Sequence, residues 1–506
     1  MISINSLIKE KETGDIYRLG ATFSTDKSNY VYDTGTGKVV QLDEESSPFI
    51  TGLFDENTSA SQLRNIADEN KNIDNVIDFL KEENLLCNPE IKHFIPLENK
   101  IKEENLQMEQ LIIELTGKCN LRCKYCIYND YNDGTRNFNT KSIEFETAKK
   151  AIDYIYLHRS NKRLAITFYG GEPLVKFDVM KQCIEYSLEH LKDCNLSFSF
   201  TTNLTLVTKE IADYLARIPN LSIVVSLDGP EEVQNTARVY ADGKPTFKDA
   251  FRGLKLLSEA INKYKKTTIT VNAVLLPPYT VERLEKINSF FGSLDFLSDD
   301  TEVRVTYPAQ GTVPESYFDE LKNKGYDDHQ IADGWFDWAI KKTRESVSNE
   351  NKHNIYSHVL EASLTQIHNR ILRDKPIDLY YYNGCCLPGQ RRLYVCTDGS
   401  YKVCERIGDS PVIGHVDTGL NEEAVKKYYL NKYEEESIQD CSKCWAVQLC
   451  DICYADCYEE SGIDIEKKRN ICKNLRNRYL SWLVYYHKVL EDYPERIDQI
   501  SKIEAN

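Results

Sequence analysis

The sequence predicts the α/β fold class, with a parallel sheet at its centre, a small module before the sheet and a cysteine-rich segment after it. From residue 108 onward, strand-like apolar runs alternate with stretches of helical periodicity. Such repeated strand–helix units imply a parallel sheet, open or closed into a barrel, with its chemistry at the carboxyl ends of the strands. Ten of the 16 cysteines fall between Cys385 and Cys472.

Length and composition narrow the possibilities. The chain has 506 residues, which at about 150 residues per domain suggests roughly three domains. Hydrophobic residues make up 41% and charged residues 28%, so folded cores are expected. The net charge of −16 disfavours a nucleic-acid partner, and no apolar run approaches the roughly 20 residues that span a bilayer. The first 18 residues lack the apolar core of a signal peptide, so we expect a cytoplasmic protein with no membrane partner.

Residues 1–95 are expected to form a small module of two or three strands and three helices, which suits a winged-helix domain. Residues 28–33 and 38–42 alternate like strands around a glycine-containing turn. Apolar positions then recur at helical spacing between Phe49 and Leu80. A generic α+β cap is the alternative interpretation. A polar linker over 96–107 is expected to follow.

The central region, 108–305, is expected to hold the strand–helix units. Strands are predicted over 111–115, 164–169, 196–201, 221–226 and 267–274. Helices are predicted between them over 145–158, 177–191, 209–216 and 247–263. Residues 306–380 are expected to form a helix-rich bridge without a chemical motif.

The C-terminal region divides into a cysteine-rich part, 381–475, and a final helix, 476–506. Spaced cysteines in an intracellular chain favour metal ligands over disulfides. The cysteine-rich part shows little apolar periodicity, so metal is expected to replace a hydrophobic core there. The final helix is expected to pack against the central barrel through one apolar face, which carries Tyr479, Trp482, Leu483, Tyr486 and Leu490.

Cys119, Cys123 and Cys126 directly follow the first strand of the central region. Three thiolates at this spacing can wrap one face of an iron–sulfur cube, and no fourth cysteine is close by in the sequence. A four-iron cluster needs a ligand at each iron, so this loop leaves one iron open to a small molecule. A structural zinc site usually has two pairs of ligands, and no histidine accompanies these cysteines.

This loop, with Tyr125 before its last cysteine, resembles the cluster-binding loop of the radical S-adenosylmethionine (SAM) superfamily. The resemblance covers residues 108–300 and includes three strand-end motifs: Gly170-Gly171-Glu172-Pro173, Thr201-Thr202-Asn203 and Ser226-Leu227-Asp228-Gly229. It implies a partial (β/α)6 TIM-like radical SAM barrel. It also implies a catalytic [4Fe–4S] cluster on the three cysteines of the loop, with SAM at the open iron.

The same resemblance implies which residues bind SAM. Backbone oxygens of Gly170 to Pro173 would hold the SAM amino group, because glycines allow close approach of the backbone. Glu172 would also tie the loops together, Asn203 would contact the ribose or carboxylate, and Arg238 would pair with the carboxylate. The expected SAM-binding residues are Tyr125, Gly170, Gly171, Glu172, Pro173, Asn203, Ser226, Asp228 and Arg238.

The cysteine-rich part resembles the SPASM domain, in which radical SAM enzymes that act on peptides carry two auxiliary [4Fe–4S] clusters. The outer cluster would be bound by Cys441, Cys444, Cys450 and Cys472. The inner cluster would be bound by Cys386 and Cys404, with a third ligand from Cys453 or Cys457. The spacing after Cys450 departs from the family pattern, so the inner cluster has either four protein ligands or an iron kept for a substrate thiolate. Cys385 and Cys396 are expected to be bystanders, and two zinc ribbons are the alternative interpretation.

The N-terminal module resembles the PqqD-like winged-helix elements that recognise ribosomally made peptides. It would bind an unmodified leader peptide as an added strand at its sheet edge. The resemblances together imply an enzyme that cleaves SAM to a 5′-deoxyadenosyl radical and abstracts hydrogen from a precursor peptide. An electron donor such as flavodoxin or ferredoxin would supply the reducing electron.

The segments around Cys386, Cys404 and Cys444 resemble maturases of cysteine-rich peptides. The expected product is therefore a thioether between a cysteine sulfur and a carbon of another residue in a cysteine-rich precursor peptide. A carbon–carbon crosslink or another peptide oxidation is the closest alternative. A sulfatase-type formylglycine maturase and an iron–sulfur electron carrier are the others.

Overall fold

The computed structural model describes residues 2–129, 137–308, 311–332, 334–345, 353–495 and 497. The last part of the predicted C-terminal helix, residue 496 and residues 498–506, lies outside the described residues. Within the described ranges, no helix combines the length and the apolar character that crossing a bilayer requires.

The N-terminal module is a three-stranded antiparallel sheet with helices packed against it. The strands predicted at 28–33 and 38–42 are confirmed, and a further strand precedes them. The strand order is β1(Gly20–Ser24), β2(Asn29–Asp33) and β3(Val39–Leu42). The helices are α1(Ile4–Thr13), η1(Asp15–Arg18), α2(Ser47–Phe54), α3(Ala60–Glu69) and α4(Ile73–Glu82). The module has its own hydrophobic cluster, which includes Leu7, Ile50, Leu53 and Leu63.

The segment after this module is more closely packed than a polar linker. It contains β4(His93–Phe94), η2(Glu98–Ile101) and η3(Glu103–Asn105). Its apolar residues Leu97, Ile101 and Leu106 are buried in the main hydrophobic cluster. The expectation of a free linker was therefore wrong, because scattered apolar side chains in a polar stretch bind it to the rest of the molecule.

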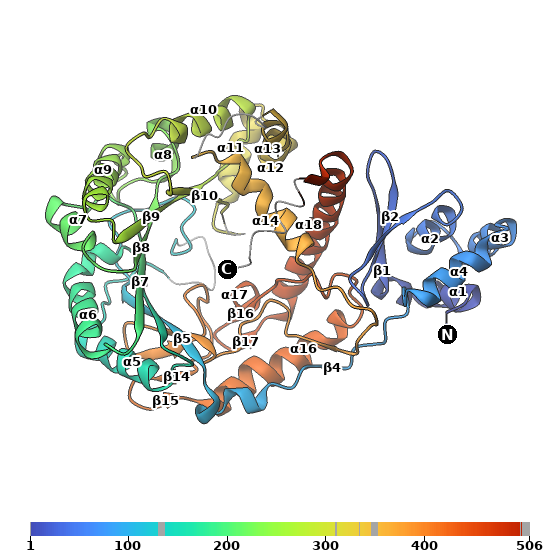
Figure 1. The fold of residues 1–506 in the computed structure, drawn as a ribbon, viewed down its shortest axis with the longest axis horizontal. Coiled ribbons are helices and arrows are strands. Elements are labelled where there is room, and N and C mark those ends of the chain that lie inside the picture. The colour runs from blue at the N-terminus through green and yellow to red at the C-terminus, as the bar shows by residue number, and fades with distance from the viewer. Residues whose placement is uncertain are drawn as a thin grey trace.

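The central sheet confirms the predicted parallel array. Its parallel strands follow one another in chain order: β5(Met108–Thr116), β6(Arg163–Gly170), β7(Asn195–Thr202), β8(Leu221–Ser226), β9(Thr267–Val274) and β10(Glu302–Thr306). The helices lie on the outside of the curved sheet (Figure 1). They are α5(Phe145–Leu157), η4(Pro173–Lys176), α6(Phe177–His190), α7(Lys209–Leu215), α8(Glu231–Ala237), α9(Phe247–Tyr264) and α10(Val281–Gly292).

The two faces of this sheet differ because side chains alternate along each strand. One face carries residues such as Ile166, Phe168 and Phe198, which are buried in the main hydrophobic cluster. The opposite face carries hydroxyl and amide side chains. On that face Gln110 Nε2 donates to Thr167 Oγ1 at 2.8 Å, and Thr167 and Ser199 share a hydrogen bond of 2.8 Å. The inner face of the sheet is therefore mainly polar along β5, β6 and β7, and it also carries the side chains of Glu114 and Tyr169.

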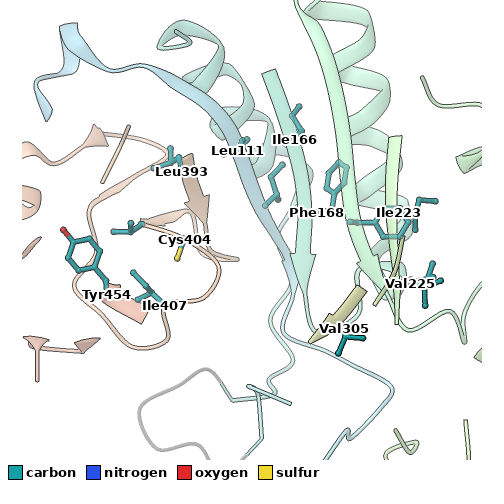
Figure 2. Packing of buried hydrophobic residues seen from close by; sticks show 14 of the residues in the cluster. Leu111, Ile166, Phe168, Ile223, Val225, Val305, Leu393, Cys404, Ile407 and Tyr454 are labelled. Atoms are coloured by element: carbon teal, nitrogen blue, oxygen red, sulfur yellow. The ribbon is translucent and has the colours of Figure 1, made fainter. Parts of the chain in front are cut away.

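The cysteine-rich region extends the central sheet instead of standing apart from it. Its strand β12(Arg391–Val395) pairs in parallel with β5, and short antiparallel strands follow. These are β13(Ser400–Lys402), β14(Gly414–His415) and β15(Gly419–Leu420). Figure 2 shows Leu393, Cys404, Ile407 and Tyr454 in one hydrophobic cluster with residues of the barrel strands.

The expectation that metal replaces a hydrophobic core in this region was wrong. Buried tyrosines fill it, among them Tyr401, Tyr429, Tyr433 and Tyr454. Their rings contact one another, as in the stacking of Tyr429 and Tyr458 at a centroid distance of 5.0 Å. Hydrophobic periodicity did not predict this tyrosine core, because the region is built from short elements. These are α15(Glu422–Ala424), a π-helix at Val425–Asn431, α16(Lys432–Cys441), α17(Tyr454–Cys457), β16(Tyr458–Glu459) and β17(Gly462–Ile463).

The helix-rich bridge is confirmed, and the final helix is longer than predicted. The bridge consists of α11(Glu315–Asn323), α12(Asp328–Ala332), α13(Gly334–Glu345), α14(Tyr356–His368) and β11(Leu379–Tyr380). The helix α18(Ile465–Asp492) begins well before residue 476 and contacts α14, α17 and β1. It stands between the N-terminal module and the rest of the molecule (Figure 1). Its apolar face therefore packs on the bridge and the N-terminal sheet, whereas the barrel was expected.

Candidate functional site

The three-cysteine loop leaves the carboxyl end of β5 and is held in place by backbone hydrogen bonds. Arg122 N donates to Val239 O at 2.8 Å, and Lys124 N donates to Ala237 O at 3.0 Å. These bonds bind the loop to the segment that carries Arg238. The loop therefore lies where the carboxyl ends of neighbouring strands meet, which is the expected place for chemistry in a parallel sheet.

The glycines at the end of β6 allow that strand end to approach the loop. Gly171 N donates to Thr116 O at 2.8 Å, and Glu172 N donates to Lys118 O at 2.9 Å. A Cβ atom on Gly171 would lie 2.2 Å from Lys118 O, and one on Gly170 would lie 2.3 Å from Thr116 O. Gly170 also has a φ of +131°. Only glycine fits this contact, because any side chain would collide with backbone oxygens.

Glu172 joins the ends of β6 and β7, as the sequence analysis expected of it. Its carboxylate is buried and accepts hydrogen bonds from Leu174 N at 3.1 Å, Thr202 Oγ1 at 2.8 Å and Asn203 N at 2.8 Å. Burial raises the pKa of Glu172 to about 7, against these hydrogen bonds, which lower it. Oε1 accepts two of these hydrogen bonds and Oε2 accepts the third.

Asn203 lies beside the first cysteine of the loop. Its Nδ2 donates to Asn120 Oδ1 at 2.9 Å and lies 3.9 Å from Cys119 Sγ. Asn120 in turn donates to Thr205 Oγ1 at 2.8 Å. Sequence reasoning did not single out Asn120, although its place between Cys119 and Cys123 was a usable signal. Together the two amides connect the cysteine loop to the end of β7.

A buried cluster of Tyr125, Asp228 and Arg238 lies beside the second cysteine. Arg238 Nε donates to Asp228 Oδ1 at 3.0 Å, and Arg238 Nη1 lies 3.8 Å from Cys123 Sγ. The Tyr125 hydroxyl donates to Asp228 Oδ2. Val274 N donates to Asp228 Oδ1 at 3.0 Å. Arg238 is thus already paired with a protein carboxylate. A ligand could accept hydrogen bonds from its remaining N–H groups.

The remaining predicted SAM-binding residues line the same strand ends. Ser226 is buried at the end of β8, and Pro173 begins the short helix η4. The structure therefore brings all nine residues to the carboxyl ends of β5, β6, β7 and β8 or to the segments that follow them. Their roles toward SAM stay predictions.

The loop thiols have the donor chemistry of an iron–sulfur site. All three cysteines are free, and burial raises the pKa of Cys119 to about 12 and that of Cys123 to about 11. The neighbouring thiols also contribute to these shifts, so the three sulfurs lie near one another. Within the described ranges, no three His, Cys, Asp or Glu side chains could hold a single metal ion. The residues fit a group that spreads its thiolate ligands over several irons.

Four thiols of the cysteine-rich region form a second group, which we call the outer thiol group: Cys441, Cys444, Cys450 and Cys472. Burial, and then the thiols of Cys441 and Cys472, raise the pKa of Cys444 to about 11. Burial also raises the pKa of Cys450, with contributions from the other three thiols. The structure thus brings together the four cysteines that the spacing assigned to one cluster.

A third set, which we call the inner thiol group, contains Cys386, Cys404 and Cys453. The Cys386 thiol adds to the effect of burial on the pKa of Cys404, and Cys404 does the same for Cys453. For the Cys457 thiol, burial raises the pKa, and the thiol that contributes to this shift is that of Cys472. Cys457 in turn acts on the pKa of Cys385. The Cys457 thiol also contacts this group, because its Sγ donates to Cys453 O at 3.4 Å.

Lys468 is a residue that the sequence analysis missed. It lies in the first turns of α18, and its Nζ donates to Cys441 Sγ at 3.3 Å. A usable signal was its position four residues before Cys472 on a helix, which places both on one face.

Comparison with known proteins was made on both sequence and fold. Residues 113–291 match the family model described as the radical SAM superfamily. The chain is 33% identical over 183 residues to the uncharacterized protein MJ0907 of Methanocaldococcus jannaschii, covering 36% of this chain and 59% of that protein. It is 31% identical over 185 residues to the radical SAM cyclopropyl synthase TigE of Paramaledivibacter caminithermalis, covering 34% of this chain and 36% of TigE.

A longer match joins the chain to a cysteine-type anaerobic sulfatase-maturating enzyme of Clostridium perfringens, with 25% identity over 354 residues, or 67% of this chain and 86% of that enzyme. Among solved structures, native anSMEcpe with bound AdoMet superposes with a TM-score of 0.52 at 21% identity, covering 78% of this chain and all of the other. This likeness shows a common fold. Residues 113–291 therefore match the radical SAM superfamily, and this part of the chain is a radical SAM domain.

Proposed function

We propose that the protein is a radical SAM peptide maturase that installs thioether crosslinks in a cysteine-rich precursor peptide. The observation that carries the proposal is the presence in one molecule of three separate thiol groups, only one of which follows the first barrel strand. One such group suffices to cleave SAM. The other two give the protein a route for the electron that an oxidative crosslink releases.

When bound, the group on the three-cysteine loop supplies the electron that cleaves SAM to the 5′-deoxyadenosyl radical, and this radical removes hydrogen from the peptide. The chain's residues position the reactants. The Gly170–Gly171 backbone packs directly against Thr116 and Lys118, and its carbonyl oxygens would accept from the SAM amino group. Asn203 and Arg238 direct N–H groups to the same side as the loop sulfurs. Glu172 keeps the strand ends together through its hydrogen bonds to Leu174 N, Thr202 Oγ1 and Asn203 N, beside the expected SAM site.

The peptide would enter along the polar inner face of the barrel. Thr167, Ser199 and Gln110 offer hydrogen-bonding groups there, on the same face of the sheet as the Glu114 carboxylate. The leader would bind at the outer edge of β3, which among the described strands pairs with β2 alone. An edge strand presents unpaired N–H and C=O groups, so an extended peptide can add to it.

The inner thiol group supports the thioether over other products. Cys386, Cys404 and Cys453 form a set of three, and the Cys457 thiol donates to the Cys453 backbone carbonyl at 3.4 Å. Three protein thiols on a four-iron group leave one position for a cysteine of the substrate. The full proposed set of cofactors is three [4Fe–4S] clusters and SAM, reduced by a donor such as flavodoxin or ferredoxin.

The first test counts iron and sulfide in anaerobically reconstituted protein and measures 5′-deoxyadenosine after reduction by dithionite. About twelve irons, as three four-iron clusters, together with deoxyadenosine, are expected. Zinc in place of iron, or SAM left intact, would contradict the proposal. Leader binding is tested by deleting residues 1–95: a leader that binds the truncated protein equally well would remove the recognition role of the N-terminal module.

The second candidate is a sulfatase-type maturase. It is favoured by the match to the Clostridium perfringens enzyme, which extends over 86% of that enzyme. Mass spectrometry of the treated peptide separates the two. A thioether leaves the sulfur in the peptide, removes a pair of hydrogens and protects the cysteine from iodoacetamide. Formylglycine formation removes the sulfur, and a carbon–carbon crosslink leaves the cysteine reactive.

A further inference from the structure

A lysine is buried among the thiols of the cysteine-rich region. Lys468 is 2% exposed, and its Nζ donates to Cys441 Sγ at 3.3 Å. The ammonium also lies over the ring of Tyr433, 4.9 Å from its centroid. The helix N-cap Asp464 fixes the start of α18 by accepting from Lys467 N at 3.0 Å, so the position of Lys468 is set by the helix and not by a flexible loop.

The surroundings of this ammonium contain sulfur where a carboxylate would be usual. Within the described part of the chain, no carboxylate forms an ion pair with Lys468, and the groups that favour its charged form are the thiols of Cys441, Cys472 and Cys457. The Cys441 sulfur, 3.3 Å from Lys468 Nζ, takes the place that a carboxylate usually occupies beside a buried ammonium. The arrangement is therefore stable when the sulfurs carry negative charge, as thiolates bound to iron do.

We propose that Lys468 is a positioning residue of the outer thiol group, whose ammonium stabilises the one-electron-reduced state of the iron–sulfur group held there. The inference rests on the proposed function, because it requires a cluster on Cys441, Cys444, Cys450 and Cys472. Hydrogen bonds to the sulfurs, nearby charge and burial are the means by which a protein sets the potential of such a group. A cation within hydrogen-bond distance of a cluster sulfur raises the reduction potential of that cluster.

The charges near the other two thiol groups differ from those near the outer thiol group, and this difference bears on the direction of electron transfer. At the three-cysteine loop, the Arg238 guanidinium near Cys123 is paired with Asp228 at 3.0 Å. At the inner thiol group the nearby charges are acidic: Asp456 acts on Cys453, and Glu405 acts on Cys404. Glu405 is only loosely paired, at 3.6 Å from Arg392.

Acidic neighbours lower the potential of the inner thiol group, and Lys468 raises that of the outer one. One electron would then pass from the reduced inner group to the oxidised outer group, which oxidises the first and reduces the second. The charges on this chain thus favour movement of the electron away from the barrel and the substrate.

The test compares Lys468→Met with Lys468→Arg, and uses Lys473→Met as the matched control. Lys473 lies on the same helix beside Cys472 but is exposed, so the control removes an equal charge from the surface. Each full-length variant is reconstituted anaerobically and analysed for iron and sulfide. It is then titrated against dithionite with redox mediators while the clusters are followed by electron paramagnetic resonance.

We expect Lys468→Met to keep its iron and one cluster to become harder to reduce. At the wild-type midpoint its reduced-to-oxidised ratio would fall at least tenfold, which is 59 mV for a one-electron couple. The midpoint potential of this cluster in Lys468→Arg would lie between those of Lys468→Met and the wild type. The midpoint potential in Lys473→Met would match that of the wild type. Formation of 5′-deoxyadenosine in the absence of peptide would be unchanged, because that step belongs to the other loop.

An unchanged set of midpoints in iron-replete Lys468→Met would overturn the inference. If Lys468→Met loses the iron of one cluster and Lys468→Arg keeps it, charge compensation is supported. Equal loss in both variants would show that the shape of the lysine matters and its charge does not, which also overturns the inference. Wild-type protein that takes up no iron would instead contradict the proposed function.

Discussion

The three-cysteine loop and the cysteine-rich region hold their thiols by opposite means. The loop is held by backbone hydrogen bonds and by the absence of side chains at Gly170 and Gly171. In the cysteine-rich region, buried tyrosine rings surround the sulfurs, and a buried lysine contacts one of them. The first arrangement leaves space for a small molecule beside the sulfurs. The second fills that space, which suits groups that only transfer electrons.

The largest expected effect separates the two regions by activity. Cys123→Ala should abolish formation of 5′-deoxyadenosine, because the loop then offers two thiols instead of three. Cys441→Ala should leave that formation intact and stop formation of the peptide product. Both are measured by chromatography of the reaction mixture. If Cys123→Ala still made deoxyadenosine, the proposed role of the loop would be wrong.

Gly171→Ala should be the most disruptive small change in the loop region. The added methyl group would lie 2.2 Å from Lys118 O, a backbone atom that moves only with the loop. Overpacking of this kind costs about 1–3 kcal/mol, and here the displacement also carries Cys119 with it. We expect a lower melting temperature and weaker SAM binding. The control is Gly243→Ala, where no heavy atom lies within 4 Å of the new Cβ. Its left-handed φ of +82° causes a loss of stability without affecting the loop.

The pH dependence of stability should report on Glu172. Its pKa is raised to about 7 in the folded protein, so the folded state binds a proton more tightly than the unfolded state does. The stabilisation is complete below the ordinary glutamate pKa and is lost as pH rises through about 7, with a total of about 3 kcal/mol. Glu172→Gln should therefore show a flatter decline in melting temperature between these pH values. Parallel curves for the wild type and the variant would contradict the assignment.

A smaller effect is expected where the N-terminal module meets the rest of the chain. Thr34 Oγ1 donates to Trp445 O at 2.7 Å, next to Cys444, and Arg370 Nε donates to Gly37 O at 2.7 Å. A Cβ atom on Gly37 would lie 2.2 Å from Ile371 O, whereas one on Gly14 would meet nothing within 4 Å.

Gly37→Ala and Gly14→Ala form a matched pair for this contact. Both glycines have a left-handed φ, +71° and +80°, so both variants bear a backbone cost of roughly 1–2 kcal/mol. Only Gly37→Ala should loosen the contact between the module and the bridge at Ile371. Faster proteolysis between the module and the barrel is the expected readout. Equal rates for the two variants would show that the contact at Ile371 is unimportant.

Much of the fold and of the candidate site could be predicted because the signals were local. The alternation of strand-like and helical patterns predicted β5 to β9. The spacing of Cys119, Cys123 and Cys126 predicted the first thiol group. The strand β10 was missed because it is short and alternates with charged residues, as in Glu302-Val-Arg304. The strand β12 was missed for another reason: its pairing partner β5 is some 280 residues away, so no local pattern reveals it.

By itself, the sequence determined the order of the units and the types of donor atom, because hydrophobic periodicity and cysteine spacing are properties of neighbouring residues. Only the tertiary structure decided which groups meet. It paired Arg238 with Asp228 and buried Lys468 against Cys441. These contacts join residues from different elements. Their energies depend on burial and on the charges that folding brings together, which no spacing along the chain records.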